Sequence, residues 1–213
     1  MAATKTTLYR NAILLLKSNA VDVATTDDDA FVNTFDLYYD RALAFALESG
    51  DWNFATRTGS IEASEDVEPK FGYSFAIEKP GDYAGRIVSI SGNERFDPRL
   101  DDYHEDGGLS GYIWCDYDPL YLRWVSNSVE YGLNLSIWSP AFERYFEHEL
   151  AWRGAGVLTN MSMAEKEEFR KERKRALMDA QGKDGRNQGA APLPRGRLVT
   201  ARGYSSIRSR WRS

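Results

Sequence analysis

The first quarter of the chain has its hydrophobic residues at helical spacing. One run predicts an amphipathic helix over about residues 6–18. A second helix is predicted to about residue 48, because the acidic cluster at residues 25–29 is typical of a helix start and Gly50 of a helix end. The apolar positions of the two helices are Leu8, Ala12, Leu15, Leu16, Phe31, Phe35, Tyr38, Ala42 and Phe45. The short polar loop between the helices favours an antiparallel pair.

Between residues 52 and 129 the hydrophobic pattern changes to a period of two, which is typical of half-buried strands. One strand is predicted over residues 71–77. Its alternating apolar residues are Phe71, Tyr73, Phe75 and Ile77. The turn-forming residues 80–82 (PGD) follow, and residues 86–90 predict the next strand.

The rest of this region predicts a loop and a hairpin. Residues 93–111 are polar, with three glycines and many acids, and indicate an exposed loop. The apolar runs 112–115 and 121–125 flank the turn residues 116–119 (DYDP), which predicts a β-hairpin.

Helical spacing returns near Ser139 and Pro140, a favourable helix start. The stripe of this third helix consists of Phe142, Phe146, Leu150, Gly154 and Val157. Small residues within 151–156 leave room for another helix to approach closely. Residues 162–165 (SMAE) form a capping box that starts a fourth helix, which we expect to end at Gly182. Its thin apolar line consists of Phe169, Ala176, Leu177 and Ala180.

This order of elements predicts an α+β fold, in which a helical bundle from both ends of the folded region carries a small antiparallel β domain inserted between them. The expected division is residues 1–51 for the N-terminal helices and 52–135 for the β subdomain. Residues 136–181 supply the C-terminal helices, and residues 182–213 form a basic extended tail.

Composition adds a strong segregation of charge. The chain has 213 residues, of which 42% are hydrophobic, enough to form a core. Residues 182–213 contain eight basic residues and one acid, a charge of +7 in a chain of net charge −5, which leaves −12 for residues 1–181. A basic tail binds nucleic acid or an acidic protein surface, whereas an acidic body repels DNA. An acidic body is therefore expected in a protein that surrounds DNA without binding it tightly.

Two further features concern membrane contact and the cellular compartment. The longest apolar run, residues 12–16, is far too short to span a membrane, so we expect a soluble chain with no membrane contact. Cys115 is the only cysteine, which fits assembly in a reducing cytosol.

Candidate catalytic and metal-binding residues are few. His104 stands in an acidic loop that offers carboxylates to a divalent cation, but the spacing does not match an EF-hand, and a solvated loop is the favoured interpretation. His148 has no second histidine at zinc-binding spacing and is expected at a helix surface or interface. Asp116 and Asp118 resemble a metal-binding acidic triplet, although the following Pro119 indicates a turn. We therefore expect no enzyme activity, no metal and no cofactor.

The aromatic residues divide into two groups. Trp52, Trp114, Trp124 and Trp152 lie in or beside periodic segments and are expected in the core, while Trp138 is expected to pack against a helix start. Trp211 stands in the arginine-rich tail, where no local core can bury it. Aromatic and arginine anchors dominate protein interfaces, so the tail is predicted to bind a partner. Its candidate binding residues are Arg195, Arg197, Tyr204, Ile207, Arg208, Arg210 and Trp211.

Five segments, in order across about residues 6–180, resemble one known family. They are residues 48–55 (ESGDWNFA), 69–75 (PKFGYSF, then Pro80), 112–122 (YIWCDYDPLYL), 138–142 (WSPAF) and 150–153 (LAWR). This series is similar to the podophage head-to-tail adaptors, also called tail tubular protein A. The acidic stretch 97–106 and the arginine-rich tail depart from the family pattern.

The resemblance implies a structural virion protein at the head–tail junction, assembled in the host cytoplasm. Copies of the chain would form a twelve-fold ring between the portal and the tail tube or nozzle, around the channel for the genomic DNA, with no catalysis and no cofactor. The tail is then expected to bind the portal. Two alternatives remain open: a tail component that binds or cleaves carbohydrate, and a nucleic-acid-binding module that uses the basic tail.

Overall fold

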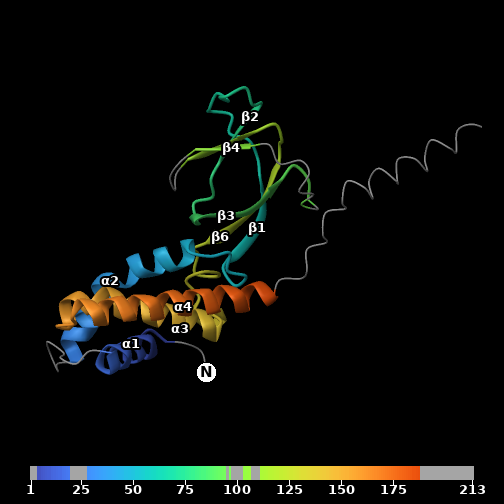
Figure 1. The fold of residues 1–213 in the computed structure, drawn as a ribbon. Helices are drawn as coiled ribbons and strands as arrows, with labels where there is room; N and C mark the ends of the chain where they lie inside the picture. Colours follow the sequence, from blue (N-terminus) through green and yellow to red (C-terminus); the bar gives the residue numbers. More distant parts are fainter. Residues whose placement is uncertain (1–3, 20–27, 95, 97–102, 107–110, 188–213) are drawn as a thin grey trace, which may run out of the picture.

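The computed structural model describes residues 4–19, 28–94, 96, 103–106 and 111–187. These residues form a helical bundle with strands at one end of it (Figure 1), which confirms the predicted α+β class. The helices are α1 (Lys5–Asn19), α2 (Asp28–Glu48), α3 (Pro140–Leu158) and α4 (Met163–Asn187). The strands are β1 (Thr56–Ile61), β2 (Phe75–Glu78), β3 (Tyr83–Ser91), β4 (Tyr103–Glu105), β5 (Tyr112–Cys115) and β6 (Leu120–Ser126).

Helix α3 is the centre of the bundle, and α1, α2 and α4 all pack against it. The small residues on α3 were expected to allow close approach of another helix, and Gly154 does so. A Cβ atom there would lie 2.8 Å from a ring carbon of Phe35 on α2, closer than a side chain tolerates. Both predicted helix starts are confirmed, because the Ser139 hydroxyl accepts the Phe142 N–H and Ser162 and Glu165 form the reciprocal capping box.

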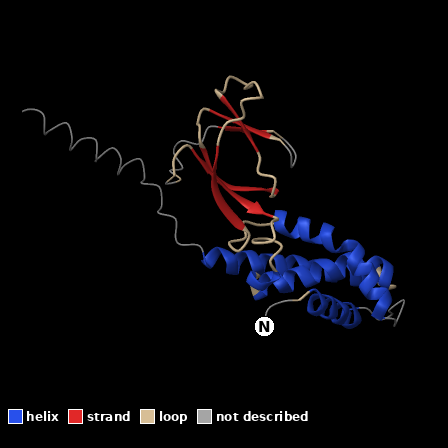
Figure 2. Ribbon diagram, turned by 180° about the vertical axis from the view of Figure 1, so that it is seen from behind, coloured by secondary structure: helices blue, strands red, loops and turns tan. Residues whose placement is uncertain are grey.

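The strands form two antiparallel sheets, in the orders β1-β6-β3 and β2-β5-β4. Figure 2 shows these strands in red beyond one end of the helices. They enclose a second core beside that of the bundle. The buried residues of this core are Ile77, Tyr83, Ile90, Ile113, Cys115, Leu120, Leu122 and Trp124. The predicted hairpin of residues 112–125 is wrong. Strands β5 and β6 lie in different sheets, because the turn at 116–119 carries the chain from one sheet to the other.

Two further strand predictions need correction. Residues 71–74 are not strand: Phe71 and Gly72 have φ angles of 58° and 84°, in the left-handed region, and β2 begins only at Phe75. The side chain of Phe71 is consequently 70% exposed. The segment predicted as an exposed loop contains the short strand β4, which pairs with β5 at the edge of its sheet.

The helical stripes are correct except at Tyr38 and near their ends. Tyr38 is half-buried, and it is the neighbouring Tyr39 that packs against the core. Phe45 and Val157 were expected in the core but are 44% and 61% exposed. In α2 the buried positions there are Leu43, Ala46 and Leu47, because these residues, and not Phe45, continue the helical face of Phe35 and Tyr39. In α3 it is Leu158 that is buried in the last turn.

Gly182 does not end the fourth helix. Helix α4 continues to Asn187, five residues beyond the expected stop. A glycine costs only about 1 kcal/mol in a helix, so tertiary contacts can outweigh it. Those contacts are made by the motif residues 48–55.

Candidate functional site

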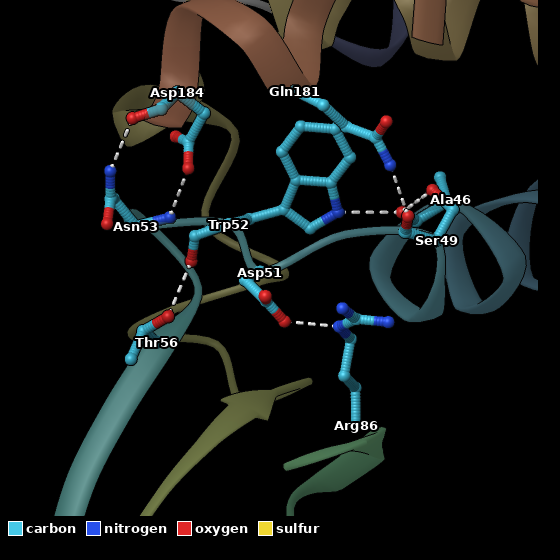
Figure 3. A network of polar contacts seen from close by, with 9 residues as sticks. All are labelled: Ala46, Ser49, Asp51, Trp52, Asn53, Thr56, Arg86, Gln181 and Asp184. Atoms are coloured by element: carbon cyan, nitrogen blue, oxygen red, sulfur yellow. Dashed lines mark hydrogen bonds and ion pairs between the residues drawn. The ribbon is translucent and has the colours of Figure 1, made fainter. Parts of the chain in front are cut away.

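The residues predicted to bind the portal lie outside the described residues. They are Arg195, Arg197, Tyr204, Ile207, Arg208, Arg210 and Trp211. The structure does describe the base of that segment, since α4 ends at Asn187 beside the start of β1. The contacts that hold this end of α4 define the candidate site, which we call the junction: Ala46, Ser49–Asn53, Thr56, Arg86, Gln181 and Asp184 (Figure 3).

Trp52 is the centre of the junction. Its side chain is 1% exposed, and its indole N–H donates to the Ala46 carbonyl at 2.8 Å. The indole lies edge to face against Phe142 on α3, with ring centroids 4.8 Å apart. A Cβ atom at Gly50 would lie 2.9 Å from the indole, so the glycine gives the ring its space. One tryptophan thus joins the end of α2 to the start of α3.

The last turn of α4 is held by residues from the bend between α2 and β1. The Asp184 carboxylate accepts the main-chain N–H of Asn53 at 3.0 Å, and the Asn53 side-chain amide donates to the Asp184 carbonyl at 2.8 Å. Gln181 donates to the Ser49 carbonyl at 2.7 Å. Figure 3 shows these bonds on either side of Trp52, so the helix end and the bend form one unit.

This turn has little intrinsic helix stability. It contains Gly182 and Gly185, and a Cβ atom at either would meet no other atom within 4 Å, so close packing requires neither glycine. Asp184 places a negative charge at the unfavourable end of the helix dipole. Its side chain is buried, and burial raises the pKa of the carboxyl group above its usual value. Among the described residues no lysine or arginine forms an ion pair with it. The turn therefore depends on Asn53 and its neighbours.

A second buried carboxylate ties α4 to α3. Glu149 is fully buried and accepts from Arg153 Nε at 2.8 Å and from Arg173 Nη1 at 3.1 Å. The two guanidinium groups lie over aromatic rings, Arg153 over Phe45 and Arg173 over Trp152. The arginine of the LAWR segment thus helps to neutralise a carboxylate between two helices.

The candidate metal and acid residues have local structural contacts. His104 lies on β4 with its ring 4.6 Å from that of Phe71, and Asp101 and Asp102 lie outside the described residues. Asp116 accepts from the Ser74 N–H and hydroxyl, and Asp118 accepts from the Ala63 N–H. Within the described residues, no group of three or more His, Cys, Asp or Glu side chains is placed to hold a metal ion.

His148 and Cys115 are both buried. His148 was expected at a helix surface or interface, and it lies at the interface of α3 with α4, where its ring is 6.3 Å from that of Phe169 and its Nδ1 lies 2.8 Å from the Arg144 carbonyl oxygen. Burial also raises the pKa of the Cys115 thiol, which disfavours the reactive thiolate. None of the described helices is long and apolar enough to cross a membrane.

The structure brings the motif segments together in two places. The GDWN residues meet α3 through the contact of Trp52 with Phe142, while Ser74 of the FGYS segment is held by Asp116 of the next motif. No protein-family model matches the sequence, and no curated protein matches it either.

Sequence reasoning missed Asn53, Asp184 and Glu149 as structural determinants. Asn53 was visible as part of a quoted motif, but nothing local connects it with an aspartate so distant in the sequence. For Glu149 the only local signal was the arginine four residues later, a spacing that allows an ion pair on one helix.

Proposed function

We propose that this chain is the structural subunit of a head-to-tail adaptor, a ring that joins the portal to the tail tube or nozzle around the passing DNA. The observation that carries the proposal is the junction. Two of the segments that resemble the adaptor family meet at Trp52 and hold the end of α4, from which the arginine-rich segment continues. A docking segment needs a fixed point of departure from a rigid body, and the junction supplies it.

Charge supports the same proposal. Residues 188–213 contain six arginines and no acid, whereas the rest of the chain is strongly acidic. An acidic body repels the phosphates of DNA that it surrounds, while a basic segment binds an acidic protein surface. We assign the portal contact to this segment and the ring to the folded body. We assign no catalytic role to the chain.

The apolar residues of the segment are expected to contribute more to docking than its charges. Ordering a flexible chain costs about 1–2 kcal/mol per residue, so attachment needs anchors that bury much surface. An exposed arginine pair contributes roughly 0–1 kcal/mol, whereas truncation of a buried tryptophan anchor costs about 2 kcal/mol or more. Trp211, with Tyr204 and Ile207, is the best anchor in the segment.

Co-sedimentation with portal rings at two salt concentrations tests the proposal. Deletion of residues 195–213 should abolish binding, and Trp211→Ala should weaken it more than Arg212→Ala, with the circular dichroism of the body unchanged. Full occupancy by the deleted chain would place the docking surface on the helices instead. Loss of binding in moderate salt, together with salt-sensitive DNA binding by the full chain, would favour the nucleic-acid-binding alternative.

A further inference from the structure

Helices α1 and α2 carry opposite charge on one small body. Helix α1 has three cations and no acid, in a chain whose body is otherwise acidic. Helix α2 has five acids and one cation. The charged residues of α1 are Lys5, Arg10 and Lys17, and those of α2 are Asp28, Asp29, Asp36, Asp40, Arg41 and Glu48.

Each helix also exposes a leucine among these charges. On α1, Arg10, Leu14 and Lys17 follow one another at helical spacing along one face, and Leu14 is 58% exposed. On α2, Leu37 is 73% exposed and shares a face with Asp40 and the later Glu48. These two faces are called the basic face and the acidic face below.

Only part of this complementarity is used within the subunit. The Lys5 ammonium group pairs with the Asp36 carboxylate at 2.6 Å, and the Tyr9 hydroxyl donates to the same carboxylate at 2.7 Å. Within the described part of the chain, Arg10, Asp40 and Glu48 form no ion pair. Arg41 lies on the same face, two turns before Glu48, and reduces the charge of the acidic face without reversing it.

Helices α1 and α2 touch where Lys5 and Tyr9 contact Asp36, but the basic face and the acidic face lie on different helices and are different surfaces. Figures 1 and 2 both show α1 below α3 and α4, and α2 inclined, with its first turns near α1 and its later part above α3 and α4 on the side of the strands. A contact between two different, complementary faces of one subunit is heterologous, and heterologous contacts generate closed rings or open filaments. Two identical faces would give only a dimer.

We propose that the basic face of one copy of this chain packs against the acidic face of the next copy. Leu14 then lies against the neighbouring Leu37, and Arg10 and Lys17 face Asp40 and Glu48. The partner is a second copy because one chain carries both complementary surfaces. That the repeated contact closes into a ring rests on the proposed adaptor function, whereas the contact itself does not.

Cysteine cross-linking tests which faces meet. The native Cys115 is fully buried, so Leu14→Cys and Leu37→Cys introduce the only exposed thiols among the described residues. Under mild oxidation the double variant should give a ladder of covalent multimers, and a mixture of the two single variants should give one heterodimer. Each single variant alone should stay monomeric. Homodimers of either single variant, or no cross-link with and without portal rings, would overturn the proposal.

Charge exchange gives a second, independent measurement. Arg10→Glu with Lys17→Glu, and separately Asp40→Lys with Glu48→Lys, should each weaken self-association by about tenfold or more at low salt. A mixture of the two should restore it, because both new contacts again join opposite charges. Lys171→Glu with Lys174→Glu on α4 is the control of equal charge change and should behave as the native chain.

The outcomes separate the contact from the adaptor function. If both reversed variants associate as the native chain does, or if folded variants fail to recover on mixing, the faces do not meet. If each reversed variant loses self-association and the mixture recovers it, but the native chain fails to bind portal rings, the contact between copies is supported and the adaptor proposal is wrong.

Discussion

Removal of the Asn53 side chain tests whether the last turn of α4 depends on the junction. Asn53→Ala deletes the amide that donates to the Asp184 carbonyl at 2.8 Å, and it leaves the main-chain N–H that binds the Asp184 carboxylate. A hydrogen bond of this kind contributes about 1 kcal/mol net. The opening equilibrium of the turn should therefore increase about fivefold.

The assay is hydrogen exchange of the amides of residues 183–187, with trypsin cleavage at Lys183 and Arg186 as a second measurement. Both should accelerate about fivefold in Asn53→Ala, while exchange in α3 stays unchanged because the opening is local. Asn11→Ala is the matched control: it removes a similar amide bond, to Glu147 at 2.6 Å, at a site distant from α4's end, and should leave these amides unaffected.

The substitution Gly185→Ala should compensate for the loss of the Asn53 side chain. Outside its own helical turn, no atom lies within 4 Å of a Cβ placed on Gly185, so Gly185→Ala should stabilise the turn by about 1 kcal/mol. Combined with Asn53→Ala it should return exchange to near the native rate. Equal exchange rates in Asn53→Ala, Asn11→Ala and the native chain would show that the junction does not hold this turn.

Three further predictions concern the folded body. Trp52→Ala should lower the free energy of unfolding by about 3–5 kcal/mol in urea denaturation, because it opens a cavity beneath three aromatic neighbours and frees the Ala46 carbonyl; an effect under 1 kcal/mol would contradict its central position. Glu149→Gln should lower the free energy of unfolding by about 1–3 kcal/mol. This loss is smaller than for a fully buried ion pair, because the side chains of Arg153 and Arg173 can turn to solvent. Burial raises the pKa of Asp184 above its usual 3.8, so the folded turn favours the protonated form. Its contribution is fully present below the unfolded pKa and is lost as pH rises through the folded pKa. Exchange at residues 183–187 should therefore, after correction for the intrinsic rate, be slower at acid than at neutral pH, and Asp184→Asn should remove this difference.

The sequence by itself determined the elements whose stability is local. The helix starts at Ser139 and Ser162 follow from side chains that cap their own main chain, and the apolar stripes locate all four helices because a helical period needs no distant partner. The small residue Gly154 was also readable as a place of close approach. From these features the α+β class could be predicted, together with the bundle that carries the junction.

The tertiary structure decided everything that depends on distant partners. Strand pairing is set between residues far apart in the chain, so the apolar runs that suggested a hairpin belong to two sheets. The alternation that predicted a strand at Phe71 gives no sign of its left-handed main chain. Helix α4 passes Gly182 because Asn53, on another element, supplies bonds that local propensity lacks. Local sequence records how each segment tends to fold, but the partners that outweigh those tendencies meet only when the chain is packed.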